Sequence, residues 1–349
     1  MSDVFFGWDI GGAHLKVAKL DGNGDIVAVR QIACPLWRGV HELSRAMTLI
    51  DFPVDDANAV HAVTMTGELC DIFPSRDEGV REILTEFLKK VSGAAAVRVF
   101  AGYDGWVDMA AAAGPQTAAV ASANWLALAA FTGEIAGDGL LIDIGSTTTD
   151  IIPIIEGEVR AVGRDDASRL INGELVYTGV VRTPVNTICD RVPYRGQWQP
   201  LAAETFATMA DVYRLLGRIK EEDDLMPSAD GRAKDLLGSA SRLARMLGRD
   251  LEGDDLGEIG GVARYVAIRQ RAKIEQAVEL VLSNEPYARH SAMMIGAGVG
   301  RFVVGELARS RNCGHRNFDA LIDCPTDIGL AATIAAPAVA AAKLAWMTV

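Results

Sequence analysis

Two short motifs combine an aspartate with glycine and hydroxyl residues, a combination that suits phosphate binding. The first is WDIGG, with Asp9, Gly11 and Gly12, and the second is IDIGSTTT, with Asp143 and Gly145. Glycine lets successive backbone N–H groups turn toward one anion, with no Cβ to hinder the approach. Each aspartate ends an apolar run, where a carboxylate suits the hydrated Mg²⁺ that accompanies phosphate groups. The second motif adds the hydroxyl donors Ser146, Thr147, Thr148 and Thr149.

The two motifs occupy matching places in an internal repeat. Residues 4–20 and residues 139–155 each have the pattern of an apolar strand, a turn of small residues and a second apolar strand. A further turn and a third strand follow each copy, at 26–31 and at 159–163. Either motif alone is most simply an ordinary hairpin turn. Their recurrence in the same context predicts two phosphate-binding hairpins.

The aligned repeats carry opposite charges at one position. With Asp9 on Asp143, Lys16 falls on Asp150. A lysine here suits charge neutralisation on a phosphate, and an aspartate suits proton acceptance. The structural alternative for Lys16 is a place on an exposed strand face.

A third glycine-rich motif, MMIGAGVG at 293–300, predicts a strand that runs into Gly296 and Gly298, followed by a helix. A dinucleotide-binding fingerprint would normally lie early, in a strand–helix–strand unit. This motif instead comes late, after a long helical region, so we reject that interpretation. A tight turn between strand and helix is the structural alternative.

The elements around the motifs predict an α/β protein. Alternating apolar patterns predict strands, and longer amphipathic or Ala-rich patterns predict helices. The predicted strands lie at 59–65 and 97–100, and the predicted helices near 39–50, 78–91, 117–132 and 328–345, with a mostly helical region at 201–284.

Composition excludes several functional classes. Among 349 residues, 50% are hydrophobic and 23% are charged, which is typical of a globular chain. The net charge of −12 disfavours nucleic acid and anionic membranes as partners. The N-terminus lacks the pattern of a signal peptide, and the apolar runs at 109–131 and 331–347 are interrupted by proline and polar residues. We therefore expect a cytoplasmic protein.

The five cysteines support the same expectation. They include no CxxC pair, and their number is odd, which fits a reducing compartment better than a disulfide framework. Cys313, His315 and Cys324 form one cluster of metal-ligand types. Their spacing matches no common zinc motif and no fourth ligand is apparent, so we favour a plain loop.

The motifs together also carry a resemblance to known families. The paired hairpins resemble the two phosphate-binding hairpins of the actin, Hsp70 and sugar-kinase superfamily, and its hydantoinase and oxoprolinase branch in particular. The combination WDIGGAHLK, TMTGELCD, ASANW and LIDIGSTTTDIIPI resembles a smaller family linked to tetrahydromethanopterin-dependent one-carbon metabolism. Archaeal members of that family resemble the synthase that builds the methanofuran core. This likeness extends over nearly the whole chain.

The resemblance implies a duplicated, two-lobed α/β fold with a cleft between ribonuclease H-like lobes. The first lobe would span 1–137, with a C-terminal helix at 328–349 packed back onto it. The second lobe would span 138–327 and contain a helical insertion at 201–285. In this fold the third motif, with Gly296 and Gly298, would lie on the adenosine side of a nucleotide site.

The implied activity is a transferase that uses the nucleotide-binding hairpins for a substrate diphosphate. An aminomethylfuran carrying a methyl diphosphate would be joined to the phenol of a glutamyl-tyramine, and diphosphate would leave. Mg²⁺ is the implied cofactor, whereas ATP would be compatible with the site but not required. The substrates would be small molecules, and a homodimer is also compatible with the sequence.

Roles follow for the residues that match the motifs. Asp9 and Asp143 would hold Mg²⁺, and Lys16 would stabilise the leaving group. The base for the phenol would be Asp150, Glu68 or Asp71, although the last two could instead cap a helix. Gly11, Gly12, Gly145, Ser146, Thr147 and Thr148 would contact the diphosphate.

Two further polar residues have equally simple structural explanations. Asn124, in ASANW, would either bind substrate or cap neighbouring backbone. His14, in the first loop, could contact phosphate, although we expect it at the surface.

Two other functional classes compete with the transferase. An ATP-dependent small-molecule kinase or amide-cleaving ATPase is a common activity of this superfamily, and fold alone does not decide function. A nucleotide-dependent regulator is the third class, but the chain has no spare segment for a DNA-binding or partner module. ATP turnover would distinguish the kinase from the transferase.

Overall fold

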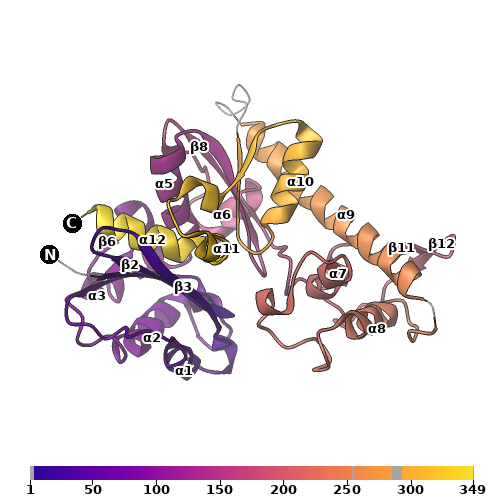
Figure 1. Cartoon of the computed structure of the whole chain (residues 1–349), viewed down its shortest axis with the longest axis horizontal. Coiled ribbons are helices and arrows are strands. Elements are labelled where there is room, and N and C mark those ends of the chain that lie inside the picture. The colour runs from indigo at the N-terminus through magenta and orange to yellow at the C-terminus, as the bar shows by residue number, and fades with distance from the viewer. Residues whose placement is uncertain (1–3, 254, 285–292, 349) are drawn as a thin grey trace. The chain divides into compact units, whose positions relative to one another are not determined.

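The computed structural model describes residues 4–253, 255–284 and 293–348. The chain separates into two compact units, which we describe one at a time (Figure 1). Unit 1 consists of Met1–Gly139, Ile154–Arg160 and Asn317–Val349. Unit 2 consists of Leu140–Pro153 and Ala161–Arg316.

Unit 1 contains a mixed six-stranded sheet in the order β3-β2-β1-β4-β5-β6. The first three strands form antiparallel pairs, and β4 and β5 continue the sheet parallel to β1. The register places Asp9 opposite Lys16 on one side and beside Thr64 on the other. The strands are β1 (Val4–Ile10), β2 (His14–Asp21), β3 (Ile26–Ala33), β4 (Ala59–Met65), β5 (Ala96–Phe100) and β6 (Trp106–Val107).

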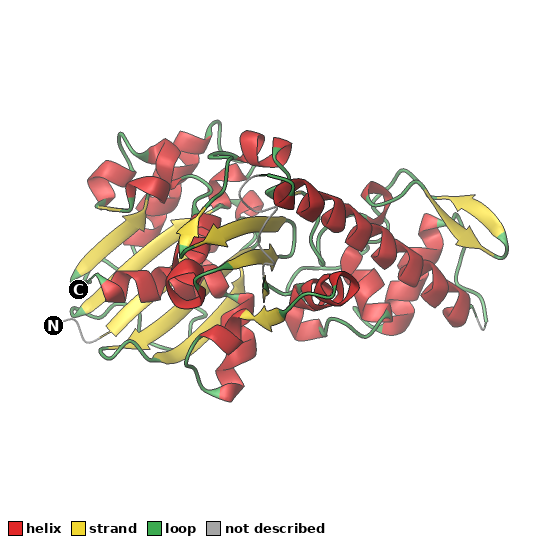
Figure 2. Ribbon diagram, turned by 90° about the horizontal axis from the view of Figure 1, so that it is seen from above, coloured by secondary structure: helices red, strands yellow, loops and turns green. Residues whose placement is uncertain are grey.

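Helices cover this sheet, and the last of them packs directly on its first strand. A Cβ on Gly7 would lie 2.0 Å from the Ala338 carbonyl oxygen, so only glycine permits this approach. Figures 1 and 2 show this last helix, α12 (Ala336–Met347), near the C-terminus and beside the strands of unit 1. The helices are α1 (His41–Met47), α2 (Arg76–Leu88), α3 (Met109–Ala112), α4 (Thr117–Val120), α5 (Asn124–Ala136), α11 (Thr326–Ile334) and α12 (Ala336–Met347).

Two helices that the sequence predicts as continuous are each divided in the structure. The predicted helix at 117–132 separates into α4 and α5, because Ser122 adopts a left-handed conformation with φ of 53°. The predicted helix at 328–345 separates into α11 and α12, which are bent by 102°, and Pro337 lies in the first turn of α12. Proline is readily accommodated there but could not continue the interior of a helix.

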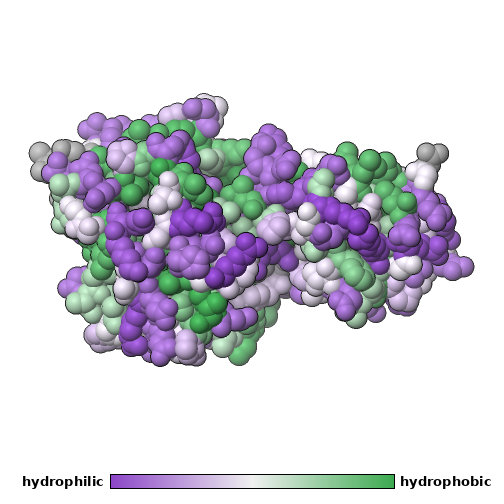
Figure 3. Space-filling model, turned by 90° about the horizontal axis from the view of Figure 1, so that it is seen from below, coloured by the Kyte–Doolittle hydropathy of each residue, from purple (hydrophilic) through white to green (hydrophobic). Residues whose placement is uncertain are grey.

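Among the described residues no single helix has the length and apolar character needed to cross a membrane. The bent pair α11 and α12 meets the length and composition requirement together, and α12 is largely buried in unit 1. On the face drawn in Figure 3, hydrophilic residues are widespread and hydrophobic residues form separate patches among them.

A buried histidine lies in the core of unit 1. The Trp8 indole N–H donates a hydrogen bond of 2.9 Å to His61 Nδ1, and the Phe6 ring stacks on the imidazole with 5.1 Å between centroids. Burial lowers the pKa of His61 to about 4, from an ordinary value of 6.5. The imidazole is therefore neutral at physiological pH, which leaves Nδ1 able to accept the indole proton.

We expect His61 to make unit 1 sensitive to mild acid. Between pH 6.5 and about 4 the unfolded chain binds a proton at this position while the folded chain does not. The free energy of unfolding should therefore fall as pH falls through this window, by about 3 kcal/mol in total. Urea unfolding monitored by tryptophan fluorescence at several pH values would measure this contribution.

The His61→Gln variant retains a hydrogen-bond acceptor for Trp8 and should show a flatter dependence on pH. His41→Gln is the matched control, because the His41 side chain is 72% exposed. Equal slopes for wild type and His61→Gln between pH 6.5 and 4 would contradict the prediction.

The second sheet has the strand order β10-β8-β7-β13-β14, and β9 pairs with the end of β8. β13 runs parallel to β7 and aligns Gly296 with Ile142. The strands are β7 (Gly139–Ile144), β8 (Thr149–Ile155), β9 (Glu158–Val159), β10 (Leu175–Val176), β13 (Met294–Ala297) and β14 (His315–Asn317).

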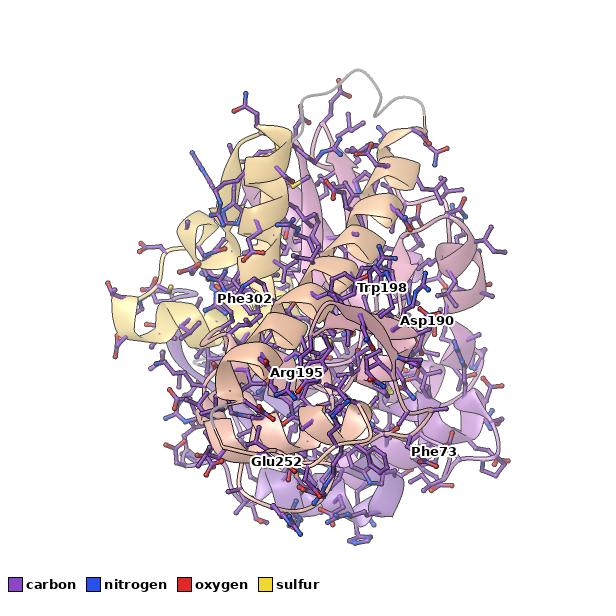
Figure 4. The ribbon with its side chains drawn as sticks, turned by 90° about the vertical axis from the view of Figure 1, so that its right-hand side faces the viewer. Phe73, Asp190, Arg195, Trp198, Glu252 and Phe302 are labelled. Carbon is purple, nitrogen blue, oxygen red and sulfur yellow. The ribbon has the colours of Figure 1, made fainter. Side chains whose placement is uncertain are left out.

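The helical region predicted at 201–284 lies in unit 2, and its described residues contain three α-helices and the short 3-10 helix Glu221–Asp223. A separate hairpin of β11 (Arg191–Tyr194) and β12 (Gln197–Pro200) lies against α9 (Leu256–Leu282), and Figure 4 labels Trp198 of this hairpin. The Trp198 ring meets the Tyr265 ring edge to face, with 5.8 Å between centroids. Arg195 of the same hairpin forms ion pairs with Asp255 and Glu258, which lie at the start of α9. The helices of unit 2 are α6 (Asp166–Ile171), α7 (Met209–Leu215), α8 (Leu236–Met246), α9 (Leu256–Leu282) and α10 (Arg301–Arg311).

Buried ion pairs hold the loop between α7 and α8. Arg242 on α8 is fully buried and contacts Asp211 at 2.7 Å and Asp230 at 3.1 Å. Arg214 on α7 contacts Asp224 of the loop at 2.6 Å. These contacts satisfy charges that would be costly to bury alone.

Candidate functional site

The first motif forms the predicted turn between β1 and β2 in unit 1. The Gly11 N–H donates to the His14 carbonyl at 3.0 Å, and the Gly12 carbonyl accepts from the Leu36 N–H at 3.0 Å. His14 is 7% exposed, so its expected place at the surface is wrong. The turn holds the end of β1, where Asp9 lies, against the start of β2.

Asp9 is the centre of a polar cluster in unit 1. Its side chain is nearly buried, and Oδ2 lies 3.2 Å from Lys16 Nζ. Asn124 Nδ2, at the start of α5, donates to Oδ1 at 3.3 Å. The Lys16 side chain is only 19% exposed, so the alternative of a lysine on an exposed strand face does not hold. The structure therefore brings together three residues that the sequence singled out separately.

A second carboxylate of unit 1 is held by the break between α4 and α5. Glu68, on the short 3-10 helix Gly67–Leu69, is 2% exposed. Ser122 Oγ donates to Glu68 Oε1 at 2.8 Å. The left-handed conformation of Ser122 costs roughly 1–3 kcal/mol for a residue other than glycine, and such strain is concentrated at functional sites. The motif ASANW thus supplies a contact to Glu68 as well as the contact to Asp9.

The second motif forms the corresponding turn in unit 2, which we call the Ser146 turn (residues 145–148). The Gly145 N–H donates to the Thr148 carbonyl at 2.9 Å, and the hydroxyls of Ser146 and Thr147 lie 3.3 Å apart. All four residues are partly exposed. This turn therefore presents two hydroxyls next to each other.

Asp143 lies at the end of β7 and is packed against the third motif. Gly298 has φ of +77°, and a Cβ there would lie 2.3 Å from Asp143 Oδ1. Gly296 lies within β13, whereas the Gly300 N–H donates to the Ile144 carbonyl at 2.8 Å. The third motif thus connects a strand to α10 and supports the end of β7.

Asp150 lies on β8 and has a buried cationic partner. Arg169 Nη2, from α6, lies 2.8 Å from Asp150 Oδ1 and 3.0 Å from the Glu174 carbonyl oxygen. The Glu174 carboxylate accepts from the N–H groups of Val162 and Gly163, while burial raises its pKa. Sequence reasoning missed Arg169 and Glu174, because no local pattern connects them with Asp150.

The residues available for a metal are few. The described part of the chain contains no group of three or more His, Cys, Asp or Glu side chains that could hold an ion. A single carboxylate beside a turn rich in hydroxyls fits Mg²⁺, which usually keeps several waters and takes other ligands from phosphate oxygens. Asp143, at the end of the strand that leads into the Ser146 turn, meets that description.

Comparisons with known proteins place these motifs in a family. The hydantoinase/oxoprolinase family model matches residues 59–346. A relative from Methanocaldococcus jannaschii is 36% identical over 253 residues, which cover 72% of this chain and 74% of that protein. It is a (4-{4-[2-(gamma-L-glutamylamino)ethyl]phenoxymethyl}furan-2-yl)methanamine synthase. A synthase of the same name from Methanococcus vannielii is 31% identical over 179 residues, covering 49% of this chain and 77% of that protein.

A solved structure supports the fold. Nucleotide-free acetone carboxylase superposes with a TM-score of 0.57 at 13% identity, over 97% of this chain and 70% of that chain. The fold class and the family predicted from the paired motifs are both confirmed. The chain belongs to the hydantoinase/oxoprolinase family and, within it, to the family of the furan-methanamine synthases.

Proposed function

We propose that this chain joins a furan methyl diphosphate to the phenol of a glutamyl-tyramine in methanofuran or methylofuran biosynthesis, and that diphosphate is the leaving group. The observation that carries the proposal is the 36% identity to a synthase over 72% of the chain. The name of that synthase describes its product as an aryl ether, in which a phenoxymethyl group links a glutamylaminoethyl-substituted ring to an aminomethylfuran.

The ether bond defines what the residues must do. The phenol oxygen forms a bond to the furylmethyl carbon, and the carbon–oxygen bond to diphosphate breaks with its electron pair. The phenol proton passes to a base. Negative charge therefore grows on the leaving diphosphate, and fixed positive charge and hydrogen-bond donors stabilise it.

The Ser146 turn is the proposed site for the diphosphate. Its support is the pair of adjacent hydroxyls together with the backbone N–H groups of a turn that begins at Gly145. Within unit 2, Asp143 would hold Mg²⁺, which would supply positive charge to stabilise the diphosphate. The role of Asp9 toward Mg²⁺ stays a prediction. The predicted contact of Gly11 and Gly12 with the diphosphate stays a prediction.

Lys16 and Glu68 are the proposed catalytic side chains. Lys16 would offset charge on the leaving group, and its contact with Asp9 would keep it oriented. We assign the base to Glu68, whose carboxylate is oriented by the hydrogen bond from Ser122 Oγ at 2.8 Å. Asp150, which contacts the Arg169 guanidinium, is the alternative.

The proposal is tested by a product assay without ATP. Purified protein is incubated with Mg²⁺, glutamyl-tyramine and the aminomethylfuran methyl diphosphate, and products are followed by mass spectrometry. We expect the ether and free diphosphate, loss of both when EDTA is added, and recovery when Mg²⁺ is restored in excess. Release of ADP from ATP with a small hydroxyl compound, and no ether, would make the protein a kinase and overturn the proposal.

A further inference from the structure

A segment far from the second motif along the chain is bonded directly to the Ser146 turn. The N–H of Val180 donates to the Gly145 carbonyl at 3.1 Å, and the N–H of Arg182 donates to the Ser146 carbonyl at 2.8 Å. A Cβ on Gly179 would lie 2.4 Å from the Thr147 nitrogen, so the two backbones meet without an intervening side chain. The position of residues 179–182 is therefore fixed relative to the turn.

Buried side chains hold this segment from behind. Gln270, on α9, is fully buried and its Nε2 donates to the Gly179 carbonyl at 2.8 Å and to Thr178 Oγ1 at 2.7 Å. Its Oε1 accepts from the Tyr213 hydroxyl at 2.7 Å. Thr183 Oγ1 in turn accepts from the Gly179 N–H at 2.8 Å. A buried network whose members are bonded in this way holds one backbone conformation.

The result is a guanidinium held beside the predicted phosphate site. Arg182 Nη1 lies 3.5 Å from Thr147 Oγ1, and the Arg182 side chain is exposed. The turn itself offers only neutral hydroxyl and N–H donors. Arginine adds a permanent positive charge and a planar fork of donors that matches two oxygens of a phosphate group.

We propose that Arg182 binds the diphosphate at the Ser146 turn, and that Gln270 and Thr183 are positioning residues that hold the Arg182 backbone against the turn. The identity of the anion as a substrate diphosphate rests on the proposed function. Binding of inorganic pyrophosphate by the turn does not rest on the proposed function, because this part of the proposal uses only contacts within unit 2.

The probe is inorganic pyrophosphate with Mg²⁺, and its dissociation constant is measured by calorimetry on the full chain. Arg182→Gln should raise that constant roughly tenfold to a hundredfold, and Arg182→Lys should raise it less. Arg191→Gln is the matched control, because Arg191 is an exposed arginine of the same unit that lies over the Trp198 ring. Unchanged affinity in Arg182→Gln, beside weaker binding in Asp143→Asn, would overturn the role of Arg182.

The positioning role is tested by whether the loss of pyrophosphate affinity in Gln270 and Thr183 variants depends on the presence of Arg182. Gln270→Met and Thr183→Val should each raise the dissociation constant for pyrophosphate several-fold while Arg182 is present. In the Arg182→Gln background the same changes should have little further effect. Equal losses in both backgrounds would show that the network supports the fold and not the arginine. Thr183→Val removes a single bond and serves where Gln270→Met fails to fold.

The two proposals fail in different ways. Pyrophosphate binding that depends on Arg182, with no ether product, would refute the synthase assignment and leave the anion site standing. Ether formation with an unchanged KM for the diphosphate substrate in Arg182→Gln would refute the role of Arg182 and leave the synthase standing.

Discussion

Replacing Lys16 by methionine is expected to lower the rate of ether formation by roughly 10²–10³-fold, the loss typical of removing one group that stabilises developing negative charge. Lys16 Nζ lies 3.2 Å from Asp9, and its side chain is mostly buried, so its ammonium is held in one place rather than moving in water. Single-turnover measurements at saturating substrate would separate this step from product release. Lys16→Arg should retain part of the rate because it keeps the positive charge.

The Asp9→Asn/Lys16→Met double variant shows what Asp9 does. If Asp9 serves only to orient Lys16, the double variant should be as slow as Lys16→Met. A further drop would show that Asp9 also acts on its own. Lys19→Met, on the same strand, is the control for charge. A rate within threefold of wild type in Lys16→Met would refute the catalytic role.

Replacing Arg242 by methionine is expected to lower the free energy of unfolding by about 3–5 kcal/mol. Arg242 is fully buried in unit 2, and its loss leaves the Asp211 carboxylate, itself 2% exposed, without the contact at 2.7 Å. Asp211 keeps a longer contact with Arg214 Nη1 at 3.6 Å and a hydrogen bond from the Thr208 N–H at 3.1 Å, but neither replaces the closer guanidinium that is lost. Urea unfolding monitored by circular dichroism would measure the change.

Arg245→Met is the matched control for Arg242, because it removes an arginine from the same helix. Arg245 contacts Asp230 at 3.5 Å, but its side chain is 35% exposed, so its loss should cost less than about 1 kcal/mol. Equal losses in the free energy of unfolding for the two variants would mean that burial does not determine how much each arginine stabilises unit 2. A cost near zero for Arg242→Met would show that the two aspartates find other partners.

The parts of the fold that the sequence revealed are those whose cause is local. Both hairpins were predicted because an apolar run, a glycine turn and a second apolar run lie next to each other in the chain. The break between α4 and α5 was missed, since the Ala-rich sequence there has high helix propensity. At the break, Ser122 donates a hydrogen bond to Glu68, and a contact between residues so distant in sequence leaves no local signal. By contrast, the bend at α12 had a local signal in Pro337.

The residues of the candidate site divide in the same way, into those with a local signal in the sequence and those without one. The turn residues of both motifs could be named from composition, because backbone anion binding requires glycine and small hydroxyl residues. The partners that orient them could not, because Arg169, Arg182 and Gln270 reach their positions only through the packing of α6 and α9. Lys16 lies between these two cases. The hairpin register places it opposite Asp9, so their contact has a local cause, whereas its proposed catalytic role comes from the aligned repeats.

The close approach of α12 to β1 has a consequence for how the nascent chain matures. The strand that meets Ala338 at Gly7 is made hundreds of residues before its helical cover. At typical elongation rates of about 5–20 residues per second, β1 waits tens of seconds for that cover. Unit 1 is therefore begun before unit 2 and completed after it, and the segment 161–316 of unit 2 can emerge and pack while the sheet of unit 1 still lacks α12.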